Sequence, residues 1–125
     1  MTNKKKRLNL LIAGSGGLIG SACLRYINNK NIFKVYSPDK KDLNYFDFYK
    51  FYNYCKLNNI DYIIYAVGKV GGILDNSLNQ SNYLLYNTEL ALNLFKVVKK
   101  TNVKKVVTFG SSCMYPLNAT QPFKE

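Results

Sequence analysis

The chain of 125 residues contains no histidine and only three cysteines, Cys23, Cys55 and Cys113, which lie far apart in the sequence. Without histidine or clustered cysteines, the sequence shows no metal-ligand spacing. Scattered cysteines in odd number argue against a disulfide framework and favour a reduced, cytoplasmic protein. No apolar run approaches the roughly 20 residues of a membrane span, so we expect no membrane partner.

Acidic residues are also few: seven Asp and Glu stand against 18 Lys and Arg, which gives a formal net charge of +11. The cations occur singly or in pairs such as Lys40-Lys41, without a basic stripe or a nucleic-acid-binding signature. This pattern favours a solvated surface suited to an anionic small ligand, and we expect no nucleic-acid partner. The basic N-terminus precedes a short apolar run and a Gly-rich turn, which predicts a strand rather than a signal peptide.

What is present is an alternation of apolar, strand-length runs with segments of helical periodicity. The expected strands are 8–13, 33–36, 61–66 and 104–109; the expected helices follow residue 17 and span about 45–57 and 81–101, with a loop at 67–79. This alternation predicts one α/β unit, a Rossmann-type doubly wound parallel sheet of about four strands. No repeat, linker or second domain is visible.

Right-handed crossovers between these strands lead us to expect the spatial order 3-2-1-4. Ligands of such sheets bind beyond the carboxyl ends of the strands, where the order reverses. We therefore expect segments Gly14–Gly20 and Gly110–Pro116 to converge on one crevice. Asn44 or Asp42 is the expected N-cap of the helix at 45–57.

Apolar residues at helical spacing predict the buried face of each helix. The three stripes are Leu18, Ile19, Ala22, Cys23, Tyr26 and Ile27 in the first helix; Phe48, Phe51, Tyr52 and Cys55 in the second; and Leu84, Leu85, Thr88, Leu92, Phe95 and Val98 in the third.

The turn after the first strand contains Gly14, Gly17 and Gly20 in the spacing G-x-x-G-x-x-G. A tight turn, close approach to a pyrophosphate and helix-on-strand packing each require a residue without Cβ. The helix that follows offers unpaired N–H groups and a positive dipole end to phosphates. Because this loop follows a strand and opens a helix, it favours dinucleotide binding over a purely structural turn.

Charged residues follow the second strand, where the adenosine ribose is expected. A carboxylate such as Asp39 prefers a free 2′-hydroxyl, whereas a cation such as Lys40 or Lys41 prefers a 2′-phosphate. The signal is therefore mixed, and a solvated lysine loop is the alternative.

Two further segments follow strands on the expected ligand side. Gly71-Gly72, within Lys69–Ile73, suggests close backbone approach to a ligand over the nicotinamide and substrate region, with an ordinary loop as the alternative. Ser111 offers a hydroxyl to a ketone oxygen, and the Cys113 thiol suits proton exchange at the neighbouring carbon. The alternative for Cys113, which we assign to Cys23 and Cys55, is a small buried apolar residue.

Together these segments and Gln121–Glu125 resemble the GDP-L-fucose synthase family, the GDP-4-keto-6-deoxy-D-mannose 3,5-epimerase-4-reductases among the NAD-dependent epimerases/dehydratases. The resemblance covers nearly the whole chain but only the first third to two-fifths of a full-length member. It implies that residues 1–125 are the N-terminal part of an NAD(P)-binding Rossmann domain, with NADP(H), or alternatively NAD(H), as cofactor. It also implies a GDP-sugar substrate and a homodimer in full-length members.

The resemblance also assigns roles to individual residues. The catalytic residues are Ser111 and Cys113; those binding the cofactor are Gly14, Gly17, Leu18, Ile19, Gly20, Lys40, Asn44, Tyr45, Ala66, Val67, Gly68 and Asn87; and those binding the substrate are Val70, Gly71, Gly72 and Ser112.

The chain departs from the family pattern in three ways. The family's Tyr-x-x-x-Lys pair and its acid/base His lie beyond residue 125, so we expect this polypeptide to be catalytically inactive. Gly16 stands where the family often carries Arg. Lys40 replaces an Arg and cannot make a bidentate phosphate contact, which weakens the NADP preference. Another nucleotide-sugar epimerase/dehydratase and a non-catalytic nucleotide-binding fragment remain the alternatives.

Overall fold

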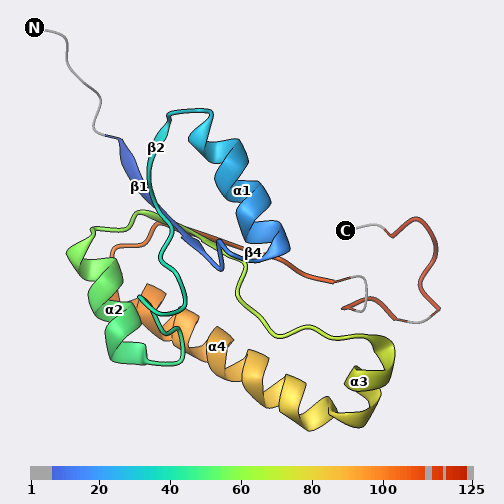
Figure 1. Cartoon of the computed structure of the whole chain (residues 1–125). Helices are drawn as coiled ribbons and strands as arrows, with labels where there is room; N and C mark the ends of the chain where they lie inside the picture. The colour runs from blue at the N-terminus through green and yellow to red at the C-terminus, as the bar shows by residue number, and fades with distance from the viewer. Residues whose placement is uncertain (1–6, 112–113, 117, 124–125) are drawn as a thin grey trace, which may run out of the picture.

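The computed structural model describes residues 7–111, 114–116 and 118–123. Its four strands form one all-parallel sheet in the order β2-β1-β3-β4. The strands are β1 (Leu8–Ala13), β2 (Phe33–Tyr36), β3 (Tyr62–Tyr65) and β4 (Lys105–Thr108); the helices are α1 (Leu18–Asn28), α2 (Phe48–Leu57), α3 (Ile73–Leu78) and α4 (Gln80–Lys100). Helix α1 covers one face of the sheet, and α2 and α4 cover the other (Figure 1). The predicted Rossmann-like α/β class is thus confirmed.

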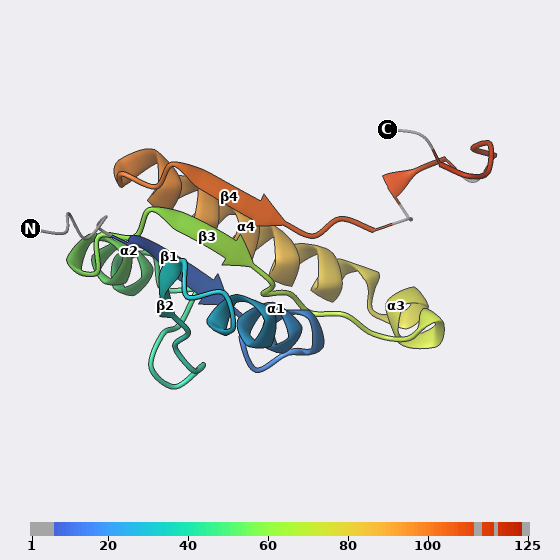
Figure 2. The same ribbon diagram turned by 90° about the horizontal axis from the view of Figure 1, so that it is seen from above.

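The expected strand order 3-2-1-4 is wrong, because β3 pairs with β1 and not with β2. Handedness alone does not decide which neighbour a returning strand chooses. Burial does: Ile63 and Tyr65 of β3 are buried, whereas β2 has no buried residue and exposes Lys34. A short strand with an outward lysine suits a sheet edge, and an apolar strand suits the centre. The order therefore reverses between β1 and β3, whose carboxyl ends lie next to each other (Figure 2).

The core lies between the sheet and the α2–α4 layer. Leu11 and Ile63, paired across β1 and β3, contribute side chains to it with Phe51 of α2 and Leu90 and Leu94 of α4. Each such side chain contributes roughly 1.5–3 kcal/mol by leaving water. This layer packs against the two central strands, from whose carboxyl ends the loops of the site leave.

Two of the predicted apolar stripes lie mostly on exposed faces, although Cys23 and Ile27 of α1 are half-buried and Val98 of α4 packs against the core. Leu18 of α1 is 88% exposed and Leu84 of α4 is 68% exposed. Helix α1 packs on the glycine loop through Gly20, its one buried residue, and α4 buries a different set: Tyr83, Leu90, Asn93, Leu94 and Val97. Periodicity identified both helices, but each carries apolar residues on more than one face, so it did not identify the buried one.

The predicted N-cap of the second helix and the predicted loop at 67–79 also differ from the structure. Helix α2 begins after Asp47, whose carboxylate accepts a hydrogen bond from the backbone N–H of Lys50 at 3.0 Å. The predicted cap Asn44 instead accepts from the N–H of Phe46 in a turn. The predicted loop 67–79 contains the short helix α3. In the part of the chain that the structure describes, no helix combines the length and apolar character of a membrane span.

Candidate dinucleotide-binding site

The turn after β1 is tight because two of its glycines leave no room for a side chain. Gly14 has φ +79°, a conformation that L-residues rarely adopt, and a Cβ there would lie 2.8 Å from the carbonyl carbon of Ala66. A Cβ on Gly20 would lie 2.6 Å from the carbonyl carbon of Gly14. These two glycines therefore let the loop approach β3 and let α1 pack on the loop.

The next two glycines face open space. A Cβ on Gly16 would meet nothing within 4 Å, and one on Gly17 would meet only the Gly14 carbonyl, at 3.4 Å. Gly17 is the N-cap of α1, which has no side-chain cap and no acidic residue in its first turn. The positive end of this helix is therefore available to an anion, and backbone can approach that anion closely.

A cavity of about 520 Å³ lies beside this loop. It is bounded by the loops after β1, β2 and β3, which is the position expected for a ligand where the strand order reverses. Its lining consists of Gly14, Ser15, Gly16, Gly17, Pro38, Asp39, Lys40, Lys41, Tyr45, Ala66, Val67, Gly68 and Tyr86.

Tyr45 forms the inner wall of the cavity and is only 5% exposed. Its ring packs edge-on against Phe51, with centroids 5.1 Å apart, and against Tyr65, at 5.9 Å. Asn93 of α4 fixes the backbone there, because its amide donates to the carbonyl oxygens of Phe46 at 2.7 Å and Tyr45 at 3.3 Å. Burial raises the pKa of the Tyr45 phenol, which stays protonated.

The buried Tyr45 hydroxyl lies close enough to the Gly14 backbone for that group to act on its pKa as a hydrogen-bond donor, but among the described residues no hydrogen bond of normal geometry satisfies it. A buried polar group without a partner costs about 1–3 kcal/mol, so folds rarely retain one without a use. Together with the uncapped helix end and the side-chain-free space over Gly16 and Gly17, it fits a site shaped for a polar, anionic ligand.

The β2 end of the cavity carries opposite charges. Asp39 accepts backbone hydrogen bonds from Asp42 and Leu43 through its carbonyl oxygen, each at 3.0 Å, which turns the chain so that Lys40 and Lys41 border the cavity. One carboxylate and two ammonium groups thus stand where an adenosine ribose would lie. The two lysines give this end the net positive charge that a 2′-phosphate needs.

Most predicted cofactor residues lie together in this wall: Gly14, Gly17, Lys40, Tyr45, Ala66, Val67 and Gly68. Five others do not line it: Leu18, Ile19, Gly20, Asn44 and Asn87. Asn87 acts on the backbone instead, since its side chain accepts from the Lys69 N–H at 2.8 Å and donates to the Lys69 carbonyl at 2.9 Å.

The cofactor-binding residues assigned from the sequence do not include six lining residues: Ser15, Gly16, Pro38, Asp39, Lys41 and Tyr86. Asp39 and Lys41 were considered at the ribose end without an assignment, and Ser15 and Gly16 adjoin assigned glycines, so their neighbourhood was a usable signal. Tyr86 is different, because it comes from α4 and reaches the cavity only through the packing of that helix beside the β3 loop.

Segment Gly110–Pro116 does not follow the strand next to β1, as the expected order had it, because β3 lies between β1 and β4; its convergence with the Gly loop on one crevice stays a prediction. Neighbouring strands are about 4.8 Å apart, so the two loops are separated by a strand width more than predicted. Ser111 is exposed, and its carbonyl oxygen accepts from the N–H of Met114 at 3.0 Å. The predicted site residues Ser112 and Cys113 lie outside the described residues.

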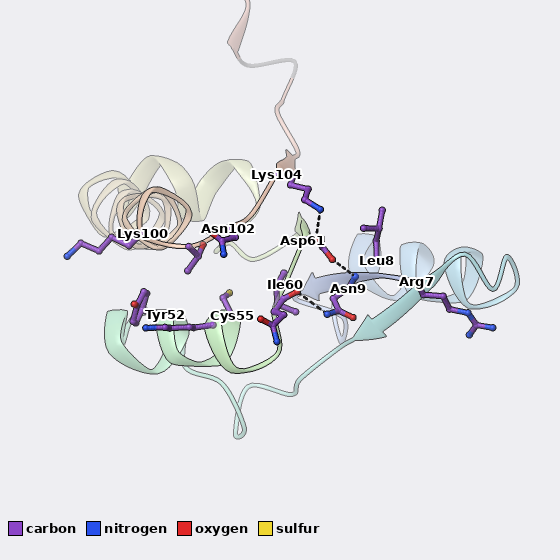
Figure 3. A pocket seen from close by; sticks show the side chains of 13 residues that line it. Arg7, Leu8, Asn9, Tyr52, Cys55, Ile60, Asp61, Lys100, Asn102 and Lys104 are labelled. Atoms are coloured by element: carbon purple, nitrogen blue, oxygen red, sulfur yellow. Dashed lines mark hydrogen bonds and ion pairs between the residues drawn. The ribbon is translucent and has the colours of Figure 1, made fainter. Parts of the chain in front are cut away.

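A second cavity, of about 760 Å³, opens at the opposite, amino ends of the strands (Figure 3). Lys104 forms an ion pair there with Asp61 at 2.7 Å, and Asp61 also accepts from the N–H of Asn9 at 2.9 Å. The C-terminal ends of α2 and α4 border it through Lys56 and Lys100. Lysines in these last turns offset the negative ends of both helices, and none of the described residues that line the space begins a helix and could receive a phosphate there. It is therefore a poor dinucleotide site.

The parallel sheet, the glycine loop at the point of reversed order and the adjacent cavity define a nucleotide-binding α/β protein of the Rossmann type. Residues 10–125 match the family model described as the NAD dependent epimerase/dehydratase family, and the chain belongs to that family.

The chain is 33% identical over 109 residues to GDP-L-colitose synthase of Yersinia pseudotuberculosis, covering 87% of this chain and 35% of that protein. It is 29% identical over 116 residues to GDP-L-fucose synthase of Escherichia coli K12, covering 93% of this chain and 36% of that protein. Its fold matches that of MlghC, the GDP-mannoheptose C4 reductase from Campylobacter jejuni with NADP bound, at TM-score 0.85 and 24% identity, over 94% of this chain and 37% of that one. The chain thus spans about a third of the length of these relatives.

Proposed function

We propose that the chain is the NADP(H)-binding part of a nucleotide-sugar epimerase/reductase of the GDP-L-fucose synthase type. The observation that carries the proposal is the cavity between the Gly14–Gly17 loop and Ala66–Gly68, at the point where the strand order reverses. The relatives named for GDP-L-colitose and GDP-L-fucose synthesis support a GDP-sugar as the substrate.

Each part of the cavity wall has a task in this proposal. Backbone at Gly16 and Gly17 and the first amides of α1 receive the pyrophosphate. Lys40 and Lys41 neutralise the 2′-phosphate as point charges. Ala66–Gly68 supports the nicotinamide half, because a dinucleotide crosses from the β2 side to the β3 side of the reversal. When bound, the cofactor supplies a hydride to a ketone carbon.

Ser111 and Cys113 keep the roles that their chemistry suggests. The Ser111 hydroxyl donates to the ketone oxygen of the sugar, and the Cys113 thiol exchanges a proton at the adjacent carbon. Val70, Gly71, Gly72 and Ser112 contact the sugar nucleotide.

The outer face of α4 is the proposed homodimer contact, and the cytoplasm is the proposed location. Leu84, Leu85, Leu92 and Phe95 are all more than half exposed on this helix, and exposed apolar patches of this kind mark protein contacts. A reduced compartment suits the unpaired Cys23 and Cys55.

Calorimetric titration of the polypeptide with NADPH and NADH tests the proposal. We expect saturable binding of one NADPH per chain, with weaker binding of NADH because Lys40 and Lys41 then lack a phosphate. Absence of binding for both would contradict the proposal, and it would equally contradict the alternative of a non-catalytic nucleotide-binding fragment. Equal affinity for the two would contradict the role given to the lysines.

A further inference from the structure

A polar cluster joins α3 to the beginning of α4 beside the Lys69–Gly72 segment. We propose that Asp75 and Tyr83 are positioning residues: their hydrogen bond fixes Lys69–Gly72 against the nicotinamide side of the cavity. This role rests on the proposed function, which makes that side of the cavity the nicotinamide site.

The cluster is centred on the Asp75 carboxylate. One oxygen accepts the Tyr83 hydroxyl, and the other accepts the side-chain amide of Asn79 at 2.7 Å. These hydrogen bonds lower the pKa of Asp75, and the carboxylate raises the pKa of Tyr83. At neutral pH Asp75 is therefore the charged acceptor and Tyr83 the donor, a charge-assisted bond of the stronger kind.

The cluster holds the two adjacent glycines directly. The Asn76 amide donates to the carbonyl oxygens of Gly71 at 2.7 Å and Gly72 at 3.1 Å. A Cβ on Gly71 would contact the Tyr83 hydroxyl and lie 2.9 Å from the Asp75 carboxylate. The backbone at Gly71 thus rests against the hydrogen-bonded pair, and a side chain at this position would displace the pair.

Lys69 connects the cluster to the cavity wall. Its backbone is held by Asn87, and its ammonium lies 4.9 Å from the ring centroid of Tyr83 and 5.8 Å from that of Tyr86. Such cation–π contacts contribute about 0.5–1 kcal/mol at exposed sites. Tyr86 lines the cavity. Because Lys69 contacts both tyrosine rings, displacement of Tyr83 also shifts Lys69 against Tyr86 in the cavity wall.

Hydrophobic packing does not fix this segment. Helix α3 has no buried residue, and Val70 is 91% exposed. Tyr83, by contrast, is only 8% exposed, although it lies near the start of α4 and close to α3. The position of Gly71 and Gly72 therefore depends on polar contacts, and loss of the Asp75–Tyr83 bond has no apolar substitute.

The experiment compares Tyr83→Phe and Asp75→Asn with the control Tyr49→Phe, which removes a phenol from an exposed position on α2. The ligands are NADPH, followed by nicotinamide fluorescence, and 2′,5′-ADP, which lacks the nicotinamide half. We expect both cluster variants to bind NADPH about three- to tenfold more weakly, the range of one hydrogen bond, and to bind 2′,5′-ADP unchanged. Amide exchange of the peptide 67–79 rises in parallel, and the control changes neither.

A purely structural role predicts a different result, since general destabilisation affects both ligands alike. An unchanged ratio of the two affinities in Tyr83→Phe and Asp75→Asn would overturn the positioning role. Failure of the unaltered chain to bind either ligand would instead contradict the proposed function. In that case amide exchange still decides the role, which is refuted if exchange of 67–79 equals that of the control.

Discussion

Substitution of single glycines by alanine distinguishes the glycines of the loop after β1 that the fold requires from those that the ligand requires. At Gly14, alanine must adopt φ +79° and place its Cβ 2.8 Å from the Ala66 carbonyl carbon. The left-handed conformation costs about 1–2 kcal/mol, and overpacking against backbone costs about 1–3 kcal/mol. We therefore expect Gly14→Ala to lower the free energy of unfolding by about 2–5 kcal/mol, a large share of the roughly 5–15 kcal/mol of a typical domain.

Gly17→Ala and Gly16→Ala are the matched comparisons. At Gly17 the added Cβ makes an ordinary 3.4 Å contact, and at Gly16 it meets nothing within 4 Å. We expect Gly17→Ala to cost at most about 1 kcal/mol of stability, as a weaker N-cap, and to weaken NADPH binding at least about tenfold by holding the pyrophosphate away. Gly16→Ala should change the stability little, because its Cβ meets no other atom, but it should also weaken NADPH binding, because that Cβ enters the open space assigned to the pyrophosphate.

Urea denaturation followed by far-ultraviolet circular dichroism gives the stabilities, and calorimetry gives the affinities. Equal stability of Gly14→Ala and Gly16→Ala would refute the close approach of the loop to β3. Unchanged NADPH affinity in Gly17→Ala would refute the assignment of α1 as the pyrophosphate site.

Three further outcomes follow from the described contacts. Burial raises the pKa of the Cys55 thiol to about 12, so iodoacetamide at pH 8 should label Cys55 only on unfolding, as peptide mass spectrometry reports; rapid labelling of the folded chain would contradict its burial. Asp47→Ala should destabilise the chain by about 1 kcal/mol in urea denaturation through loss of the α2 cap, whereas Asp42→Ala, at one of the two caps that the sequence suggested, should cost less. Lys40→Ala should weaken NADPH binding and leave NADH binding unchanged, and a parallel loss for both cofactors would argue against a 2′-phosphate contact.

The sequence predicted the fold class, the strands and the long helices, because apolar runs and helical periodicity are local properties. It did not predict the strand order, because that order depends on which strand β3 pairs with. β3 pairs with β1, which is buried, and not with β2, which lies at the sheet edge. Exposed apolar residues such as Leu84 misled the assignment of buried faces, since a helix with two apolar sides carries two periodic signals. In the candidate site, Gly14 and Lys40 were predictable from the glycine pattern and the strand end, whereas Tyr86 and the Asp75–Tyr83 bond arise from how α3 and α4 meet.

The central claim is that NADPH occupies the cavity between the Gly14–Gly17 loop and Ala66–Gly68. Amide hydrogen exchange of the chain with and without saturating NADPH tests it most directly. We predict slower exchange in peptides covering 14–20 and 66–72, with no change in those covering 56–61 and 100–104 at the opposite cavity. Protection of 56–61 and 100–104 instead, or binding of NADPH without protection of 14–20, would contradict the claim.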